Sequence, residues 1–308
     1  MTGATSSRDL IDLAKIADES NRWDYVWVGD SLLTVPRLES VVLTSALAVS
    51  TRRLRLGIGC MASLGLRPAF EVAIQLASLD LLSEGRLTLA ACTGPSKGEA
   101  VERELGIFGL THKEKVSRME DRIRLLRAAS DPRGEGPSYE GAGLVKPDFV
   151  QRPFPIWMVA NPPSSARREV VERSLARVAR LGDGWMTFGL PPNQLQERID
   201  RLKELGEGRS TLADSFPICV YVDVNICANS AEAMDDAVVT CRSEGRRNAS
   251  AEQLKVSAAV GSLQECLSFI APLVKAGVTH LALRPVSQQP RVQVERMTEE
   301  LLPALASL

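Results

Sequence analysis

Apolar residues follow two patterns that alternate along the chain. Apolar positions three and four residues apart predict amphipathic helices, and short continuous apolar runs predict buried parallel strands. The predicted strands are residues 23–29, 54–60, 86–92, 156–160, 184–188, 217–227 and 278–284. The predicted helices are residues 10–21, 39–50, 68–82, 114–128, 169–181, 192–205, 230–242, 263–276 and 292–305.

This alternation predicts an α/β fold, because parallel strands that follow one another need helical crossovers. The strands fall one short of a (β/α)8 TIM barrel, and the chain begins with a helix where a complete barrel begins with a strand. We therefore expect a TIM barrel lacking its first β-strand, with an open doubly wound sheet as the competing architecture. Uniform composition indicates one domain over residues 1–308, with irregular insertions at about 131–155 and 243–262.

Charge and composition exclude several classes of function. The chain has 308 residues, with 37 Lys and Arg against 38 Asp and Glu, and this balance argues against a nucleic-acid partner. It has no apolar run long enough to cross a membrane, and its polar N-terminus lacks the apolar core of a signal peptide. We expect a cytoplasmic protein that acts on a small-molecule substrate.

Missing motifs narrow the chemistry further. The two histidines have no second ligand at metal spacing, so no metal site is expected, and the six cysteines form no CxxC pair. The chain also lacks the GxSxG elbow of serine hydrolases and the glycine-rich loops of Rossmann and P-loop proteins.

In a barrel, functional groups lie at the carboxyl ends of the strands. Those ends here carry one aspartate and one arginine but no histidine: residues 29–31, 60–61, 92–94, 161–165, 187–188, 225–227 and 284–285. Such a site leaves the difficult chemistry to a cofactor. Asp30 is equally well explained as a helix cap or a loop carboxylate.

The loop of residues 160–165 leads towards a predicted helix, where backbone N–H groups and hydroxyls form an anion site. Ser164 and Ser165 are candidates for it, with simple helix capping as the alternative. Arg118 is a candidate for the same phosphate. Its alternative is an ion pair with Glu114 or Asp121 on its own helix.

Four segments resemble the bacterial luciferase-like flavin-dependent oxidoreductase and monooxygenase family. They are DYVWVGDSLL at residues 24–33, SEGRLTLAACTG at 83–94, VQRPFPIWMVA at 150–160 and LGDGW at 181–185. LDLLSEGR at residues 79–86 is the most specific piece. Order and spacing are similar over roughly residues 8–305, and the resemblance implies a (β/α)8 barrel.

The resemblance implies a flavin, usually FMN reduced by a separate flavin reductase, or the deazaflavin F-420 in some branches. It places Cys60 and Met61 at a strand-end bulge beside the flavin, where a non-prolyl cis peptide is typical of the family. The residues expected to bind the cofactor are Cys60, Met61, Cys92, Gly94, Arg118, Asn161, Ser164, Ser165 and Thr187. Asp30, Ser31 and Arg284 are expected on the substrate side, and Asp30, Ser31 and Cys92 are the catalytic candidates.

The chain departs from the family in two ways. The opening strand is missing, so a preceding segment or a partner would fill the gap. Ser31 stands where many members have histidine, and Leu66-Arg67-Pro68 stands where Arg-His-Pro is common.

We expect a monooxygenase that uses reduced FMN and O2 on a small organic substrate. The alternatives are an F-420-dependent hydride-transfer reductase or dehydrogenase, and a non-catalytic or accessory homologue. The family also implies a homodimer, commonly formed through helices that flank the early strands.

Overall fold

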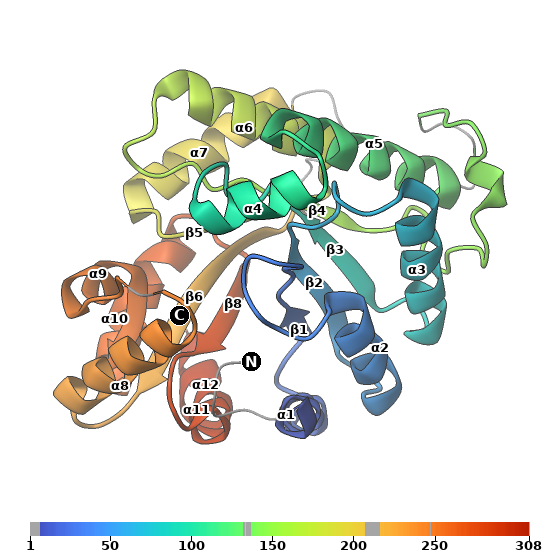
Figure 1. Ribbon diagram of the computed structural model, residues 1–308. Coiled ribbons are helices and arrows are strands. Elements are labelled where there is room, and N and C mark those ends of the chain that lie inside the picture. Colours follow the sequence, from blue (N-terminus) through green and yellow to red (C-terminus); the bar gives the residue numbers. More distant parts are fainter. Residues whose placement is uncertain (1–6, 132, 134–136, 207–215, 247, 308) are drawn as a thin grey trace. The chain divides into compact units, whose positions relative to one another are not determined.

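The computed structural model describes residues 7–131, 133, 137–206, 216–246 and 248–307 (Figure 1). The chain forms two compact units. One is Asp24–Val159, and the other combines the chain up to Trp23 with the chain from Ala160 onwards. The single-domain organisation stays a prediction, and each unit is described by itself.

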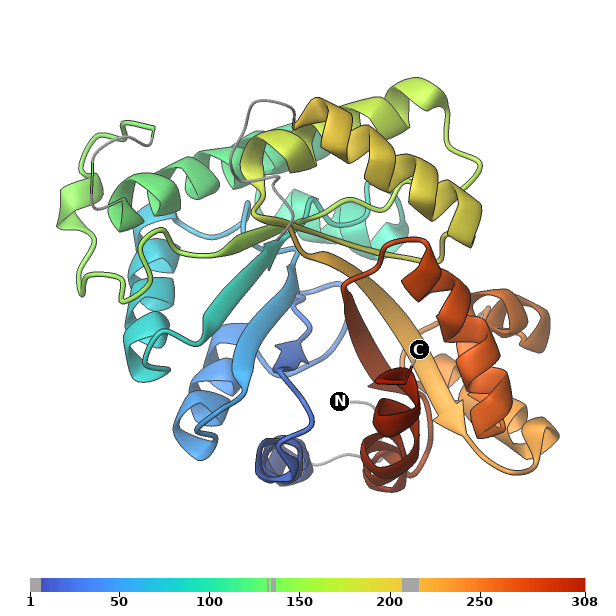
Figure 2. The ribbon, with the colours of Figure 1, turned by 180° about the vertical axis from the view of Figure 1, so that it is seen from behind.

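The Asp24–Val159 unit is built on four parallel strands in sequential order. They are β1 Tyr25–Val28, β2 Arg55–Met61, β3 Leu87–Ala91 and β4 Ile156–Val159. Its helices are α2 Ser40–Ser50, α3 Ala69–Leu82, α4 Glu99–Ile107 and α5 His112–Ser130, with a short 3-10 turn at Ala142–Leu144. Helices α2 and α3 pack beside each other, as both views show (Figure 2).

The two faces of β2 have different environments. Leu56 and Ile58 on one face are fully buried in the core. On the other face, Gly57 and Gly59 lie against the Trp27 ring, and a Cβ added to Gly57 would lie only 2.0 Å from that ring. Trp27 also stacks on Tyr25 at 5.3 Å between ring centroids. The glycines of β2 are therefore required by this close approach of an aromatic ring.

The second unit contains α1 Ser7–Ser20 and four parallel strands: β5 Gly184–Phe188, β6 Ile218–Ile226, β7 Ala258–Gly261 and β8 His280–Pro285. Strand β6 pairs with β5 along its first half and with β7 along its second half, while β8 pairs along its other edge. The helices are α6 Arg168–Leu181, α7 Pro192–Leu205, α8 Ser230–Ser243, α9 Ala251–Ser257, α10 Leu263–Lys275, α11 Pro290–Arg296 and α12 Leu302–Leu305, with a π-helical turn at Met297–Leu301 before α12.

Parallel pairing in both units confirms the predicted α/β fold class, and all seven predicted strands are present. The sequential order of β1 to β4 is that of a barrel, because a doubly wound sheet reverses its order at a switch point. In the described part of the chain, no strand precedes α1, and β1 pairs only with β2.

The predicted number of strands was wrong. An eighth strand, β7, and helix α9 lie in the segment 243–262 that was expected to be irregular. Strand β7 has the sequence AAVG, whose small residues give no strong apolar run, and it is held by pairing with β6. Helix α4 was also missed, because its polar sequence resembles a connecting segment.

The segment LDLLSEGR acts as a structural clamp. Asp80 is fully buried, and its carboxylate accepts hydrogen bonds from the backbone N–H groups of Val150 and Gln151 at 2.8 and 2.9 Å and from the Gln151 side chain. The guanidinium of Arg86 donates to the carbonyls of Ala48 and Leu54, among others. The motif thus joins the end of α2, the start of β2 and the chain leading to β4.

Asp80→Ala is expected to lower the free energy of unfolding by about 3–5 kcal/mol, because three donors lose a buried charged acceptor. Chemical denaturation followed by circular dichroism measures this change. Asp148→Ala, which removes an exposed carboxylate from the same unit, is the matched control and should cost less than about 1 kcal/mol. Equal effects of the two substitutions would contradict the assignment of Asp80 as a clamp.

Candidate functional site

The ends of β1, β2 and β3 bring several of the predicted site residues together. Asp30 follows β1, Cys60 and Met61 end β2, and Cys92 and Gly94 follow β3. These strands are neighbours in one parallel sheet, so their carboxyl ends lie along the same edge. This edge carries the first group of candidate residues.

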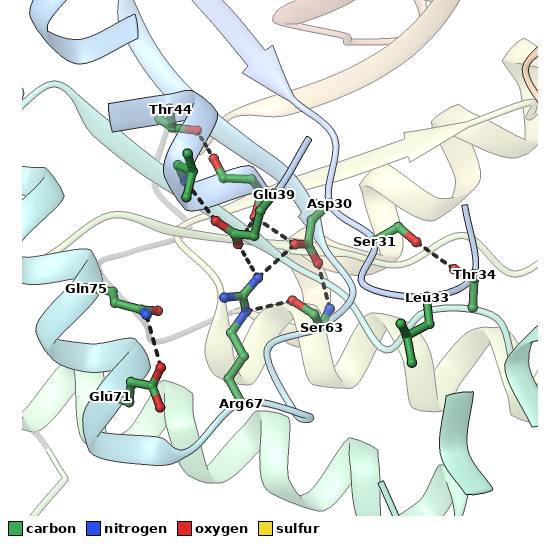
Figure 3. Close-up of polar contacts among 12 residues, drawn as sticks. Asp30, Ser31, Leu33, Thr34, Glu39, Thr44, Ser63, Arg67, Glu71 and Gln75 are labelled. Atoms are coloured by element: carbon green, nitrogen blue, oxygen red, sulfur yellow. Dashed lines mark hydrogen bonds and ion pairs between the residues drawn. The ribbon is translucent and has the colours of Figure 1, made fainter. Parts of the chain in front are cut away.

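Asp30 is the centre of a buried polar network (Figure 3). Ser40 Oγ donates to its carboxylate at 2.7 Å, and the Ser63 N–H donates at 2.8 Å. Arg67 Nη2 lies 3.4 Å from Asp30 Oδ1 and 2.5 Å from Glu39 Oε1. Glu39 also caps the N-terminus of α2 through the N–H of Val42. Asp30 therefore links β1 to α2 and to the loop that follows β2.

Ser31 forms a local turn rather than joining this network. Its hydroxyl shares a hydrogen bond of 2.8 Å with Thr34 and accepts one from the Val35 N–H (Figure 3). The same loop is held from another direction, because the Leu33 N–H donates to the carboxylate of Glu104 on α4. Ser31 thus helps to fix the shape of the loop that follows β1.

Lys115 is a buried cation that sequence reasoning missed. Its ammonium lies 3.4 Å from the carboxylate of Glu104, and both side chains are almost fully buried. A Cβ on Gly94 would lie 3.2 Å from the same ammonium, so the cation reaches the end of β3. Lys115 and the buried Met119 are four residues apart on α5 and so lie on the same face of the helix. A lysine on this apolar face was the sequence pattern that could have indicated a buried cation.

Two thiols meet at this edge. The Sγ atoms of Cys60 and Cys92 are 2.9 Å apart, and Cys92 donates to Cys60. The pairing of β2 with β3 shifts between Gly59 and Met61, and a cis peptide joins Gly59 to Cys60, where the family resemblance placed one. The hydrogen bond from Cys92 lowers the pKa of Cys60 and raises the pKa of Cys92 well above its usual range.

The other unit carries the second group of predicted residues. The amide oxygen of Asn161 accepts hydrogen bonds from Thr187 Oγ1 at 3.0 Å and from the Phe188 N–H. Ser164 and Ser165 are exposed in the loop before α6. Arg167 is the N-cap residue of α6 and gives it no side-chain cap. Neither serine therefore caps this helix, which removes the simpler explanation for them.

Arg198 of α7 fixes the position of this loop. Its guanidinium is buried and donates to the carbonyls of Pro162 and Pro163 at 2.7 and 3.3 Å, and burial lowers its pKa. Ser164 lines a cavity of about 550 Å³ between α6 and α7. Arginines project into the same cavity, which is lined by Ser164, Arg168, Glu172, Asn193, Arg198 and Arg201 among others.

Arg284 is held in a partly buried ion-pair cluster. Its Nε lies 2.8 Å from Asp223, its Nη1 lies 2.9 Å from Glu244, and its guanidinium carbon lies 5.5 Å from the centroid of the Tyr221 ring. Arg246 binds the same Asp223 carboxylate at 2.6 Å. Within the described residues, Arg284 Nη2 is buried and has no hydrogen-bond partner. The proposed role of Arg284 towards substrate stays a prediction.

Arg118 is exposed on α5, and its charge contributes to lowering the pKa of Glu114, after the hydrogen bonds from Thr111. Asp121 instead pairs with Arg122 and Arg124. Arg118 belongs to one unit, whereas Ser164 and Ser165 belong to the other. The shared phosphate site of these three residues therefore stays a prediction.

Neither histidine stands directly at a strand end of this edge. His280 begins β8 at its amino end, and His112 begins α5. Among the described residues, no group of three or more histidines, cysteines and acidic residues is arranged to hold a metal ion. In the same part of the chain, no helix is both long and apolar enough to cross a membrane.

Asp30→Ala is expected to destabilise the protein by about 3–5 kcal/mol, because Arg67, Ser40 and the Ser63 N–H lose a buried charged acceptor. Denaturant titration measures the loss. Glu99→Ala, which removes an exposed carboxylate from the same unit, should change stability by less than about 1 kcal/mol. A loss below 1 kcal/mol for Asp30→Ala would argue against this network as the support of the site.

Comparisons with known proteins extend these observations. The chain is 23% identical to an F420-dependent glucose-6-phosphate dehydrogenase of Amycolatopsis mediterranei, over 98% of this chain and 95% of that protein. Its fold matches monooxygenase RslO1 from Streptomyces bottropensis with a TM-score of 0.74, at 19% identity and over 98% and 95% of the two chains. An F420-dependent secondary alcohol dehydrogenase matches with a TM-score of 0.75, at 12% identity and over 96% and 94%.

These fold matches agree with the predicted TIM-barrel class of the luciferase-like type, since they extend over nearly the whole chain. The sequence model of one family, described as luciferase-like monooxygenase, matches residues 1–280. The match includes the clamp motif, the thiol pair and all the candidate residues except Arg284. The chain belongs to the luciferase-like monooxygenase family.

Proposed function

We propose that this protein is a flavin-dependent monooxygenase that uses reduced FMN and O2 on a small organic substrate. The observation that carries the proposal is the edge formed by β1, β2 and β3, where a bulge, two thiols and a buried cation meet in a luciferase-like chain. The strand ends at this edge carry no histidine. A bound flavin would supply the electrons for the reaction.

The described residues fit the phosphate of FMN. The first turn of α6 has no side-chain cap, and the N–H groups of Val170 and Val171 donate to the Arg167 carbonyl. The N–H groups of Arg168 and Glu169 would therefore be the ones that bind an anion. Ser164 and Ser165 precede it with exposed hydroxyls, and Arg168 adds a positive charge. Arg198 holds the carbonyls of Pro162 and Pro163 and would keep this loop in place when phosphate binds.

The strand ends fit a flat ring system. Gly94 adopts a left-handed conformation with φ of 68°, and an added side chain there would approach Lys115 and Ala62. Cys60 and Cys92 are small and carry no charge when protonated. Lys115 would stabilise negative charge on a reduced ring placed against this edge. Asp30 would act as a positioning residue, because its oxygens are already engaged by Ser40, Ser63 and Arg67.

The second candidate is hydride transfer with the deazaflavin F-420. It is favoured by the similarity to a glucose-6-phosphate dehydrogenase that depends on F420, which covers 98% of this chain. It is also favoured by the strand ends themselves, which carry no histidine, because hydride transfer needs few proton movements. Both candidates use the same strand edge, and they differ in the cofactor that binds.

Titration of the purified protein with reduced FMN, oxidised FMN and F-420 tests both candidates, with binding measured by fluorescence and thermal stabilisation. We expect FMN to bind in the micromolar range. Ser164→Ala combined with Ser165→Ala should weaken FMN binding about tenfold, because two hydroxyl donors to the phosphate are lost. Ser174→Ala, on the same helix, is the control and should leave binding unchanged.

Each outcome of this titration has a distinct meaning. Binding of F-420 alone would overturn the FMN proposal in favour of hydride transfer. Binding of neither cofactor at high micromolar concentration would favour a non-catalytic or accessory homologue. Binding of FMN, followed by substrate-dependent consumption of O2 with an added flavin reductase, would support the monooxygenase.

We also propose that the protein forms a homodimer through α2 and α3. Helix α2 has no charged residue, and its Val42 and Val49 are 67% and 71% exposed. Helix α3 packs beside it and exposes Ile74 and Leu81. An apolar surface of this kind on two adjacent helices is typical of protein–protein interfaces.

Val49→Glu combined with Ile74→Glu is expected to convert the dimer into a monomer, because two charges would be buried without partners. Size-exclusion chromatography with light scattering measures the molar mass. Val256→Glu, on exposed α9, is the control and should leave the dimer intact. A wild-type protein that is monomeric at micromolar concentration would contradict the proposal.

A further inference from the structure

Cys60 and Cys92 stand apart from the other cysteines. They come from the neighbouring parallel strands β2 and β3, whose register pairs Met61 with Ala91. Their sulfurs are 2.9 Å apart. In the part of the chain that the structure describes, no other two sulfurs are in hydrogen-bond contact. Cys219, Cys227, Cys241 and Cys266 all lie in the other unit.

The separation of the two sulfurs is short. A disulfide bond is about 2.05 Å long, so the two sulfurs need to approach by only about 0.9 Å from their present separation. Cys60 lies in the bulge just before the Met61–Ala91 pair, and Cys92 directly follows that pair. Closing the gap would therefore combine rotation about the side-chain bonds with a local adjustment of the bulge.

The two thiols differ in a way that assigns their roles. Cys60 is partly exposed, whereas Cys92 is buried. The hydrogen bond that Cys92 donates lowers the pKa of Cys60, although burial and the charge of Asp30 oppose this. The same hydrogen bond and burial raise the pKa of Cys92, against the opposing charge of Lys115. Cys60 is thus the more exposed residue of the pair and the thiol that ionises first, and Cys92 keeps the proton.

We propose that Cys60 and Cys92 form a redox-active pair that a hydroperoxide oxidises to an intramolecular disulfide. The Cys60 thiolate attacks the terminal peroxide oxygen, the O–O bond breaks, and Cys60 becomes a sulfenic acid while an alcohol, or water from hydrogen peroxide, leaves. Cys92 then attacks the Cys60 sulfur, the S–S bond forms, the S–O bond breaks and water leaves. Two thiols and one hydroperoxide give one disulfide, one alcohol or water, and one water.

This proposal does not rest on the proposed function, because it concerns the thiols alone. The disulfide would join the ends of β2 and β3 and would remove both thiols from the candidate cofactor edge. A thiol reductant such as dithiothreitol would reverse it. The pair would then be a reversible modification site at the edge where the cofactor is expected to bind.

The test uses the full-length protein, reduced and then treated with hydrogen peroxide, with free thiols blocked by N-ethylmaleimide under denaturing conditions. Trypsin releases Cys60 in a peptide of residues 56–86, because the bond before Pro68 resists cleavage, and Cys92 in a peptide of residues 87–97. We expect mass spectrometry to find these two peptides linked and to find them separate after dithiothreitol. Cys227→Ser, which removes the other partly exposed cysteine, should give the same link at the same rate.

Two variants test the assigned roles. With Cys92→Ser, oxidation is expected to stop at the sulfenic acid of Cys60, which dimedone traps. With Cys60→Ser, Cys92 is expected to react at least tenfold more slowly than Cys60 does in the Cys92→Ser variant. A wild-type protein in which both thiols remain free, or in which the link joins other cysteines, would overturn the proposal. Equal reactivity of the two single variants would overturn the division of roles.

Discussion

The carboxylate of Asp30 is the interaction on which the candidate site depends. It gathers a hydroxyl from the start of α2, a backbone N–H from the loop after β2 and the guanidinium of Arg67 around one buried negative charge. Burying a charge is costly unless hydrogen bonds and an opposite charge compensate. These partners meet that requirement, and in doing so they fix the chain on either side of the strand ends.

At this site the buried carboxylates hold the structure in place, and other groups are left to contact a cofactor. The carboxylates of Asp30 and Glu104 are engaged by donors from other segments, and Asp80 of α3 does the same for the chain that leads to β4. The groups that remain at the edge are thiols, small side chains and an ammonium. Such a set binds and polarises a cofactor but moves few protons, which agrees with chemistry supplied by a flavin or deazaflavin.

Much of the fold could be predicted from the sequence, because a long, largely apolar run marks β6 and an amphipathic stripe marks α6. Strand β7 could not, since AAVG lacks such a run and is a strand only through its pairing with β6. The polar segment of α4 was missed for a similar reason. Its buried Glu104 becomes understandable only once Lys115 is seen opposite it.

The site was only partly predictable. The positions of Asp30, Cys60 and Cys92 at neighbouring strand ends follow from parallel pairing, whereas the partners of Asp30 come from segments up to 37 residues away. No sequence pattern identified Arg198 as a site residue, because it donates to the carbonyls of Pro162 and Pro163, about 35 residues earlier in the chain. Contacts of this kind depend on packing between helices and loops, which no local pattern encodes.

The contact of Trp27 with Gly57 and Gly59 limits how this protein can change. The ring fills the volume that side chains at those two positions would need, so enlarging either glycine requires a smaller residue at Trp27 at the same time. The residues allowed at these three positions therefore depend on one another. Divergence or redesign of this face of the sheet would have to make Trp27 smaller before, or together with, any enlargement of Gly57 or Gly59.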